Sequence, residues 1–173
     1  MKKIIYTFLA LFIFNSSALA NNWSAEEKNE MIKAFSISFS AFEKKDAAGV
    51  FALHPPKYIA YLAKEQNLEV SAFEKKANQD INRSFQITKS ITYEINTKNN
   101  KKDIEYLQTA GGEKYAIINY TSYAIFNEGD KDSFSDQAVA VKIDGKWYFL
   151  ERNSNTITIL KATYPQFNDI KNP

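Results

Sequence analysis

The first half of the chain has the hydrophobic pattern of helices. Between residues 25 and 45, apolar side chains recur mostly at steps of three and four residues, which places them along one side of a helix. Ser24 precedes this segment as a good N-cap, and acidic side chains in the first turn favour the helix dipole. We therefore expect a helix over about 25–45 with a wide apolar stripe facing the core. The stripe consists of Met31, Ala34, Phe35, Ile37, Ser38, Phe39, Ala41 and Phe42.

Shorter helical segments follow the first helix. One begins at Asp46 and ends at a pair of prolines, which cannot continue a helix but can start the next one. That next helix is expected over residues 56–66. Ser71 and Glu74 have the spacing of a capping box and predict that a further helix opens there.

After these helices the hydrophobic period changes from 3.6 to 2, which indicates strands. Apolar and polar residues alternate over 87–95, and a polar loop is expected over 97–102. Residues 103–110 read as a second strand, and Gly111-Gly112 as a hairpin turn into a third.

The third strand is expected over residues 114–126 and carries apolar side chains on both faces. A strand of about 13 residues must bend or curl to stay on a small core. A loop over 127–132 then leads into the last pair of strands, 133–152. Asp144-Gly145 between apolar runs predicts a two-residue hairpin there, because a type I′ turn needs a positive φ at both central residues.

The end of the chain is less strongly patterned. Residues 156–162 suit either a strand or a short final helix, and residues 166–173 are expected to be a flexible tail. The order of elements predicts a single α+β domain over 21–165. Its N-terminal helices should pack in the concave face of a curved antiparallel sheet of about four to six strands.

The first twenty residues are expected to be a cleaved Sec-type signal peptide. Two lysines precede an apolar run over 4–14, and Ala18-Leu19-Ala20 is a small-x-small cleavage site. The run is too short to span a bilayer, which takes about 20 apolar residues. We therefore expect a periplasmic or secreted protein that has no membrane association after the signal is removed.

Charge and cysteine content exclude several functions. Removing two of the 22 basic residues leaves 20 against 20 acidic ones, so the processed protein is formally neutral. Neutrality argues against nucleic acid or an anionic membrane as the main partner. The absence of cysteine excludes disulfides, thiolate metal sites and the lipid anchor of a lipoprotein.

Three stretches of the chain carry a family resemblance: Ala41-Phe42-Glu43-Lys44-Lys45-Asp46, His54-Pro55 and Asp144-Gly145-Lys146-Trp147-Tyr148-Phe149. With them, residues 25–152 or thereabouts resemble the nuclear transport factor two-like superfamily of cone-shaped α+β proteins. Members commonly place a long helix in the mouth of a curled sheet and finish with a DGKW hairpin. That superfamily includes isomerases, cyclases, dehydratases, transport adaptors and exported proteins, so the resemblance implies a fold and a pocket rather than one function.

Catalytic motifs are scarce. His54 is the only histidine, and beside two prolines it is expected at a helix end or the surface rather than as a base. We therefore expect no Ser-His-Asp triad around His54, and no His/carboxylate cluster has metal-ligand spacing. We therefore expect no metal and no cofactor.

Polar residues on the strands are the best candidates for a site. Tyr123, Asp136 and Arg152 could line an isomerase-like or anion-binding pocket, if the strand register brings them together. The alternative, which we favour, is that Asp136 and Arg152 are cross-strand surface partners worth well under ~1 kcal/mol. Tyr120, on the other face of its strand, and Tyr148, on the face of Arg152, complete the candidate ligand-binding set.

Three functions remain open. The first is a non-enzymatic binding protein for a small apolar ligand in the cone or for a protein partner, including an immunity factor against a periplasmic toxin. The second is an isomerase or dehydratase with Asp136 or Asp80 as base and Tyr120 or Tyr123 as hydrogen-bond donor. The third is a homodimeric structural or interaction module.

The shape of the cone discriminates between these functions. A cavity of ~300 Å³ or more would favour a small ligand. A cone packed by aromatic side chains would instead leave the protein partner. The enzyme requires a carboxylate buried in an apolar pocket, where burial raises its pKa. The aromatic residues expected to fill the cone are Phe35, Phe39, Tyr120 and Trp147.

Overall fold

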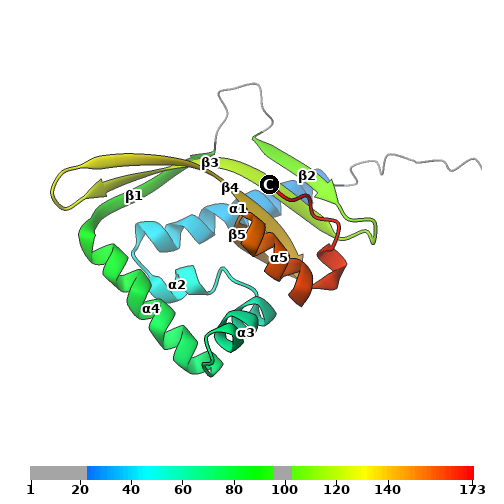
Figure 1. Cartoon of the computed structure of the whole chain (residues 1–173). Helices are drawn as coiled ribbons and strands as arrows, with labels where there is room; N and C mark the ends of the chain where they lie inside the picture. The colour runs from blue at the N-terminus through cyan, green and yellow to red at the C-terminus, as the bar shows by residue number, and fades with distance from the viewer. Residues whose placement is uncertain (1–22, 96–102) are drawn as a thin grey trace, which may run out of the picture.

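The computed structural model describes residues 23–95 and 103–173, which form five α-helices, one five-stranded antiparallel sheet and a short 3-10 helix (Figure 1). The predicted signal peptide and the predicted loop over 97–102 lie outside these residues. The elements are α1 (Ala25–Glu43), α2 (Ala47–Phe51), α3 (Pro56–Glu65), α4 (Val70–Ile87), β1 (Thr88–Ile95), β2 (Ile104–Gln108), β3 (Lys114–Phe126), β4 (Lys131–Ile143), β5 (Lys146–Glu151), α5 (Ser154–Thr163) and η1 (Pro165–Phe167). The predicted α+β class, with helices ahead of a curved antiparallel sheet, is confirmed.

The sheet is organised around β3. One edge of β3 pairs with β4 along almost its whole length, and β4 in turn pairs with β5. The other edge of β3 is shared by two strands that lie end to end. β2 pairs with Lys114–Ile118 of β3, and β1 pairs with Tyr120–Phe126. The third strand has the predicted bounds, and its length is used to hold three other strands together.

The predicted turn between the last two strands is confirmed. Asp144 and Gly145 have φ values of 50° and 79°, as a type I′ turn requires. The register places Ile143 opposite Lys146, so the loop has two residues. Trp147 begins a run of four buried side chains in β5, which supplies apolar area to both faces of the sheet.

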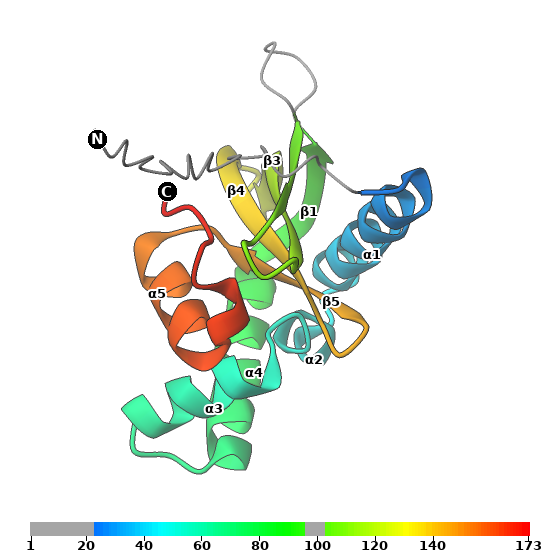
Figure 2. The ribbon, with the colours of Figure 1, turned by 90° about the vertical axis from the view of Figure 1, so that its right-hand side faces the viewer.

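A helix covers each face of the sheet, and Figure 2 shows the sheet between α1 and α5. On the concave face, Met31 and Phe35 of α1 are fully buried against residues such as Ile118 and Phe149. On the opposite face, Leu160 of α5 is fully buried in a second core. The ambiguous segment 156–162 is therefore helical, because its apolar residues pack on this sheet face beside Tyr58 of α3.

The N-terminal helices begin where capping groups are available. Ser24 caps α1, and the side chain of Glu27 bonds back to the Ser24 amide, which completes a capping box. The capping box expected at Ser71 is wrong, because α4 already begins at Val70 after Glu69 and has no side-chain cap. Packing of Phe73 against α3 holds this end of the helix instead.

The expected flexible tail over 166–173 is also wrong. Phe167 and Ile170 are buried in the core beneath α5. Arg152 donates hydrogen bonds to the carbonyls of Lys171 and Asn172, at 3.2 and 2.6 Å. Apolar anchors and one guanidinium therefore hold the end of the chain against the domain.

Candidate functional site

A cleft opens between α1, the segment after α2 and the concave face of the sheet. Its volume is about 250 Å³. Most of its lining is apolar or aromatic, and the rest includes a histidine and two carboxylates. We call this the inner cleft, and its lining is Phe35, Ser38, Phe39, Phe42, Val50, Leu53, His54, Tyr120, Asp136, Ala138, Phe149, Leu150 and Glu151.

Aromatic side chains fill the space deeper in the cone. The ring of Phe35 lies 4.8 Å from that of Phe39 and 5.3 Å from that of Phe149, measured between centroids. Tyr120 packs on the same cluster, 5.2 Å from Phe39. Trp147 is buried in the same core, as expected, and also stacks on Trp23 at 5.4 Å. The inner cleft is thus the space that remains above a packed aromatic floor. Its volume is below the ~300 Å³ expected of a small-ligand pocket.

Two carboxylates lie beside each other at the rim of the inner cleft. Asp136 is directly opposite Tyr120 in the β3–β4 pair. Glu151 is opposite Ala138, two residues along β4, so both acids are on the concave face as diagonal neighbours. Both side chains are exposed, and neither has a hydrogen bond or ion pair with any residue that the structure describes. The rim therefore carries two charges that nothing in the described part of the chain neutralises.

The other titratable groups of the cleft are uncharged near neutral pH. Burial, with the nearby charges of Asp136 and Glu151, raises the pKa of Tyr120 to about 12. Burial lowers the pKa of His54, which opposes the effect of its hydrogen bond to the Phe51 carbonyl at 3.2 Å. Tyr120 therefore stays protonated and His54 neutral, and the inner cleft has a net negative charge with no cation in its lining.

The structure brings together only part of the predicted site. Tyr120 and Asp136 meet in the inner cleft, but the group of Tyr123, Asp136 and Arg152 is wrong. Tyr123 and Arg152 point to the face opposite Asp136, because side chains alternate along each strand and the registers fix which faces coincide. Tyr123 is 41% exposed there, and its hydroxyl donates to Glu94 at 3.3 Å.

Arg152 has a structural role rather than the expected pairing with Asp136. Its guanidinium donates to the side-chain carbonyl of Gln137, whose amide in turn donates to Asn119 at 2.7 Å. Tyr148 is buried in the core under α5, with the Lys146 ammonium 4.9 Å from its ring centroid. Neither Arg152 nor Tyr148 lines the inner cleft.

Asp80 is also outside the cleft. It lies on α4, where it accepts a bond from Arg83 at 3.1 Å, and both side chains are more than half exposed. Sequence reasoning missed Glu151 and set aside His54. The alternation of Trp147, Phe149 and Glu151 along one strand was the available signal for Glu151, but its face could not be assigned without the register.

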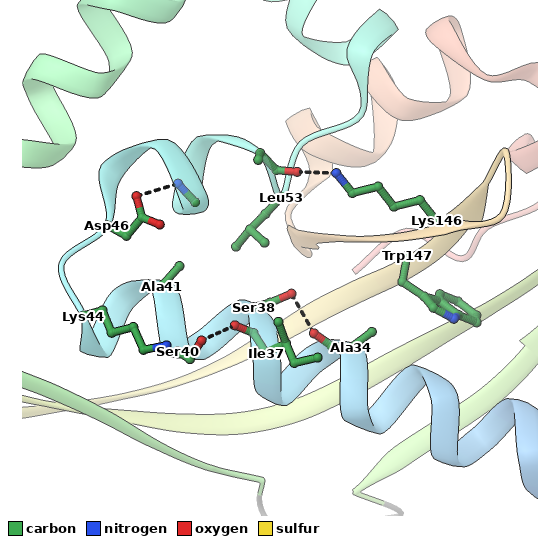
Figure 3. A pocket seen from close by; sticks show the side chains of 12 residues that line it. Ala34, Ile37, Ser38, Ser40, Ala41, Lys44, Asp46, Leu53, Lys146 and Trp147 are labelled. Carbon is green, nitrogen blue, oxygen red and sulfur yellow. Dashed lines mark hydrogen bonds between the residues drawn. The ribbon is translucent and has the colours of Figure 1, made fainter.

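A second, larger groove, which we call the outer groove, lies between α1, α2 and the β4–β5 turn (Figure 3). Its volume is about 390 Å³. The hydroxyls of Ser38 and Ser40 donate to carbonyls of their own helix, and the ammonium of Lys146 donates to the carbonyl of Ala52 at 3.3 Å. Asp46 caps the amide of Gly49 at 3.0 Å. These groups are already used internally, and the exposed ammonium of Lys44 is left as a charged group of the lining with no hydrogen bond or ion pair to a described residue.

No cluster of metal-ligating side chains occurs within residues 23–95 and 103–173, and no helix in these ranges is long and apolar enough to cross a membrane.

No protein-family model matches the chain, and no curated protein matches it significantly. Among solved structures, the 1.8 Å structure of Aln2 from a Streptomyces species is similar, with a TM-score of 0.48 and 11% identity. The match covers 79% of this chain and 96% of that chain. A similarity this low identifies neither a family nor a function.

Proposed function

We propose that this protein is an exported, non-enzymatic binding protein, and that it recognises a cationic side chain of a protein partner in the inner cleft. The observation that carries the proposal is the pair of unneutralised carboxylates, Asp136 and Glu151, above an aromatic floor. A lysine or arginine side chain matches this arrangement, because its charge would lie between the acids and its stem against the rings.

The packed cone supports a protein partner over a small apolar ligand. Phe35, Phe39 and Tyr120 occupy the space where an enclosed apolar ligand would sit. The remaining 250 Å³ has room for a side chain but is small for a ligand that must be buried on most of its surface.

The geometry gives less support to the isomerase or dehydratase alternative. That mechanism needs a carboxylate inside an apolar pocket, so that burial raises its pKa toward the working pH. Asp136 is exposed at the rim, and Asp80 is in an exposed ion pair on α4. Export and membership of the nuclear transport factor two-like superfamily remain part of the proposal, and rest on the N-terminal pattern and the hairpin motif.

The test uses three small probes of nearly equal shape. Benzamidinium is a flat cation, benzamide is its neutral counterpart, and benzoate is the matching anion. In amide-resolved NMR titrations, we expect benzamidinium to shift the signals of Tyr120, Asp136 and Glu151. Benzamide should bind more weakly, and benzoate should not bind there, because the rim is negative.

Two variants and one control make the result specific. Asp136→Asn and Glu151→Gln should each weaken benzamidinium binding by roughly two- to fivefold, the size of an exposed charge contact of about 0.5–1 kcal/mol. Asp80→Asn removes one carboxylate outside the cleft and should leave binding unchanged. Equal affinity for benzamidinium and benzamide, or an equal loss in all three variants, would overturn the proposal.

A further inference from the structure

The first half of β4 has a free edge. β5 pairs with β4 only from Ala138 to Ile143, so Lys131–Asp136 pairs with β3 on one side and with no described strand on the other. All six of these residues are exposed. Figure 1 shows this part of the β3–β4 hairpin extending beyond the helices. We call Lys131–Asp136 the distal edge.

The hydrogen bonds at both ends of the distal edge show which backbone groups face outward. The carbonyl of Gln137 accepts from the amide of Arg152, on the β5 side, at 2.7 Å. The carbonyl of Asp130 accepts from the amide of Phe126, on the β3 side, at 2.8 Å. Because these directions alternate along an antiparallel strand, odd-numbered residues offer their N–H and C=O groups at the free edge. These residues are Lys131, Ser133 and Ser135.

The side chains of the distal edge form an acid–aromatic–acid pattern on the concave face. Asp132, Phe134 and Asp136 alternate along the strand and share that face. Phe134 is 48% exposed, and Asp136 also belongs to the inner cleft. The edge is therefore continuous with the proposed cation site.

Symmetry argues against a second copy of this chain on the distal edge. An antiparallel pair of identical edges is related by a two-fold axis perpendicular to the sheet, which keeps each face on its own side. The register centred on Phe134 then places Asp132 opposite Asp136 twice, and like charges directly opposite are destabilising. Lys131 points to the other face and cannot lie opposite either acid. The charges thus disfavour self-pairing in this register.

We infer that the distal edge binds an extended segment of the partner as an added antiparallel β-strand. The matching segment has a basic, an apolar and a basic side chain at alternate positions, opposite Asp132, Phe134 and Asp136. This inference rests on the proposed function, since the basic residue opposite Asp136 is the one that the inner cleft receives. The carboxylate of Asp132, which now accepts from the Ser133 amide at 2.8 Å, would turn to the other cation.

The sheet already contains two strands that lie end to end along one edge of a longer strand. β1 and β2 lie end to end along one edge of β3. An added strand would lie in the same way beside β5 along one edge of β4. Main-chain hydrogen bonds would then supply affinity, and the alternate side chains would supply specificity.

The test uses the protein expressed from its complete chain and a blocked synthetic peptide with lysine, valine and lysine at alternate positions, separated by threonines. Calorimetry should detect binding of this peptide to the protein. The counterpart with glutamate in place of both lysines should bind at least roughly tenfold more weakly, because two cross-strand pairs become repulsive. Equal binding of the two peptides would overturn the inference.

A backbone control separates strand pairing from simple charge attraction. N-methylation of the peptide amides that face β4 removes donors and leaves both lysines intact. We expect this peptide to lose most of its binding, whereas binding equal to that of the parent would overturn strand addition. In the protein, Ser133→Pro removes an outward N–H without touching the β3 ladder, and should also weaken the parent peptide; Ser133→Thr keeps the N–H and is the matched control.

The outcomes distinguish this inference from the proposed function. Benzamidinium binding to Ser133→Pro should be unchanged, since the inner cleft is intact. If benzamidinium binds and no peptide does, the cation site stands and strand addition is wrong. If light scattering shows a dimer of the unmodified protein that Ser133→Pro abolishes, the edge binds a second copy and the inference is also wrong.

Discussion

The two halves of the β3–β4 hairpin share one hydrogen-bonded ladder but differ sharply in burial. The proximal half pairs Tyr115–Ile118 with Ala138–Val141, and none of these residues is more than 5% exposed. The distal half pairs Thr121–Ile125 with Lys131–Ser135, and every residue of its β4 strand is exposed. Cross-strand pairing is thus continuous while the packing on it is not.

The difference arises from which helices reach which part of the sheet. α1 and α5 cover opposite faces of the proximal half, so its side chains are buried on both sides. Burial of apolar area, not the ladder itself, supplies most of the stability of a sheet. The proximal half therefore holds the domain together, and the distal half is available for binding.

The largest expected effect is in the proximal core. Ile118→Ala should lower the free energy of unfolding by about 2–5 kcal/mol, because Ile118 is fully buried and leaves a cavity. Phe134→Ala in the distal half removes a larger side chain but should cost less than about 1 kcal/mol, since Phe134 is half-exposed. Urea denaturation measures both. Similar losses would contradict the division into two halves.

An intermediate effect is expected at the border between the halves, where Arg152 joins Gln137 to the end of the chain. Arg152→Ala should destabilise the domain by about 1–3 kcal/mol, because charge-assisted hydrogen bonds are lost. It should also speed hydrogen exchange of the amides from 167 to 172. Arg152→Lys keeps the charge but cannot donate to Gln137 and to the end of the chain at once. Its free energy of unfolding should therefore lie between those of the unmodified protein and Arg152→Ala. Unchanged exchange in Arg152→Ala would show that burial of Phe167 and Ile170 alone holds the tail.

The smallest expected effect is a pH dependence at Lys114, the first residue of β3. The Glu27 side chain bonds to the Lys114 ammonium and to the Ser24 amide, which lowers the Glu27 pKa from 4.5 to about 2. A pKa that is lower in the folded than in the unfolded state contributes stability above pH 4.5, and this contribution is lost as the pH falls through 2.

Glu27→Gln should therefore flatten the dependence of unfolding free energy on pH between about 4.5 and 2. The effect should be small because the carboxylate is solvent-exposed. Glu26→Gln removes the same charge one residue earlier, without the Lys114 contact, and should leave that slope in place. Equal slopes in the two variants would assign the pH dependence to other carboxylates.

Much of the architecture could be predicted because its signals are local. The turn at Asp144 and Gly145 needs only two residues that tolerate positive φ, and the long strand over 114–126 has a continuous β pattern. The segment over 156–162 could not be assigned, because its apolar residues suit a strand or a helix equally. Its helical state depends on the sheet face that it covers.

The candidate site was only half predictable for the same reason. Alternation assigns Tyr120 and Tyr123 to opposite faces of one strand. It does not say which of them shares a face with Asp136, because that depends on the register between two strands. The register pairs Tyr120 with Asp136 and brings Glu151 beside them, and it sends Arg152 to the other side.

The sequence by itself therefore determined the N-terminal helices, the strands, the final hairpin and the curled α+β sheet, since each depends on neighbouring residues. Only the tertiary structure decided three features. These are the inner cleft, the sheet face that α5 covers and the distal edge. Each arises where segments distant in the chain meet or fail to meet, and hydrophobic period carries no information about that distance.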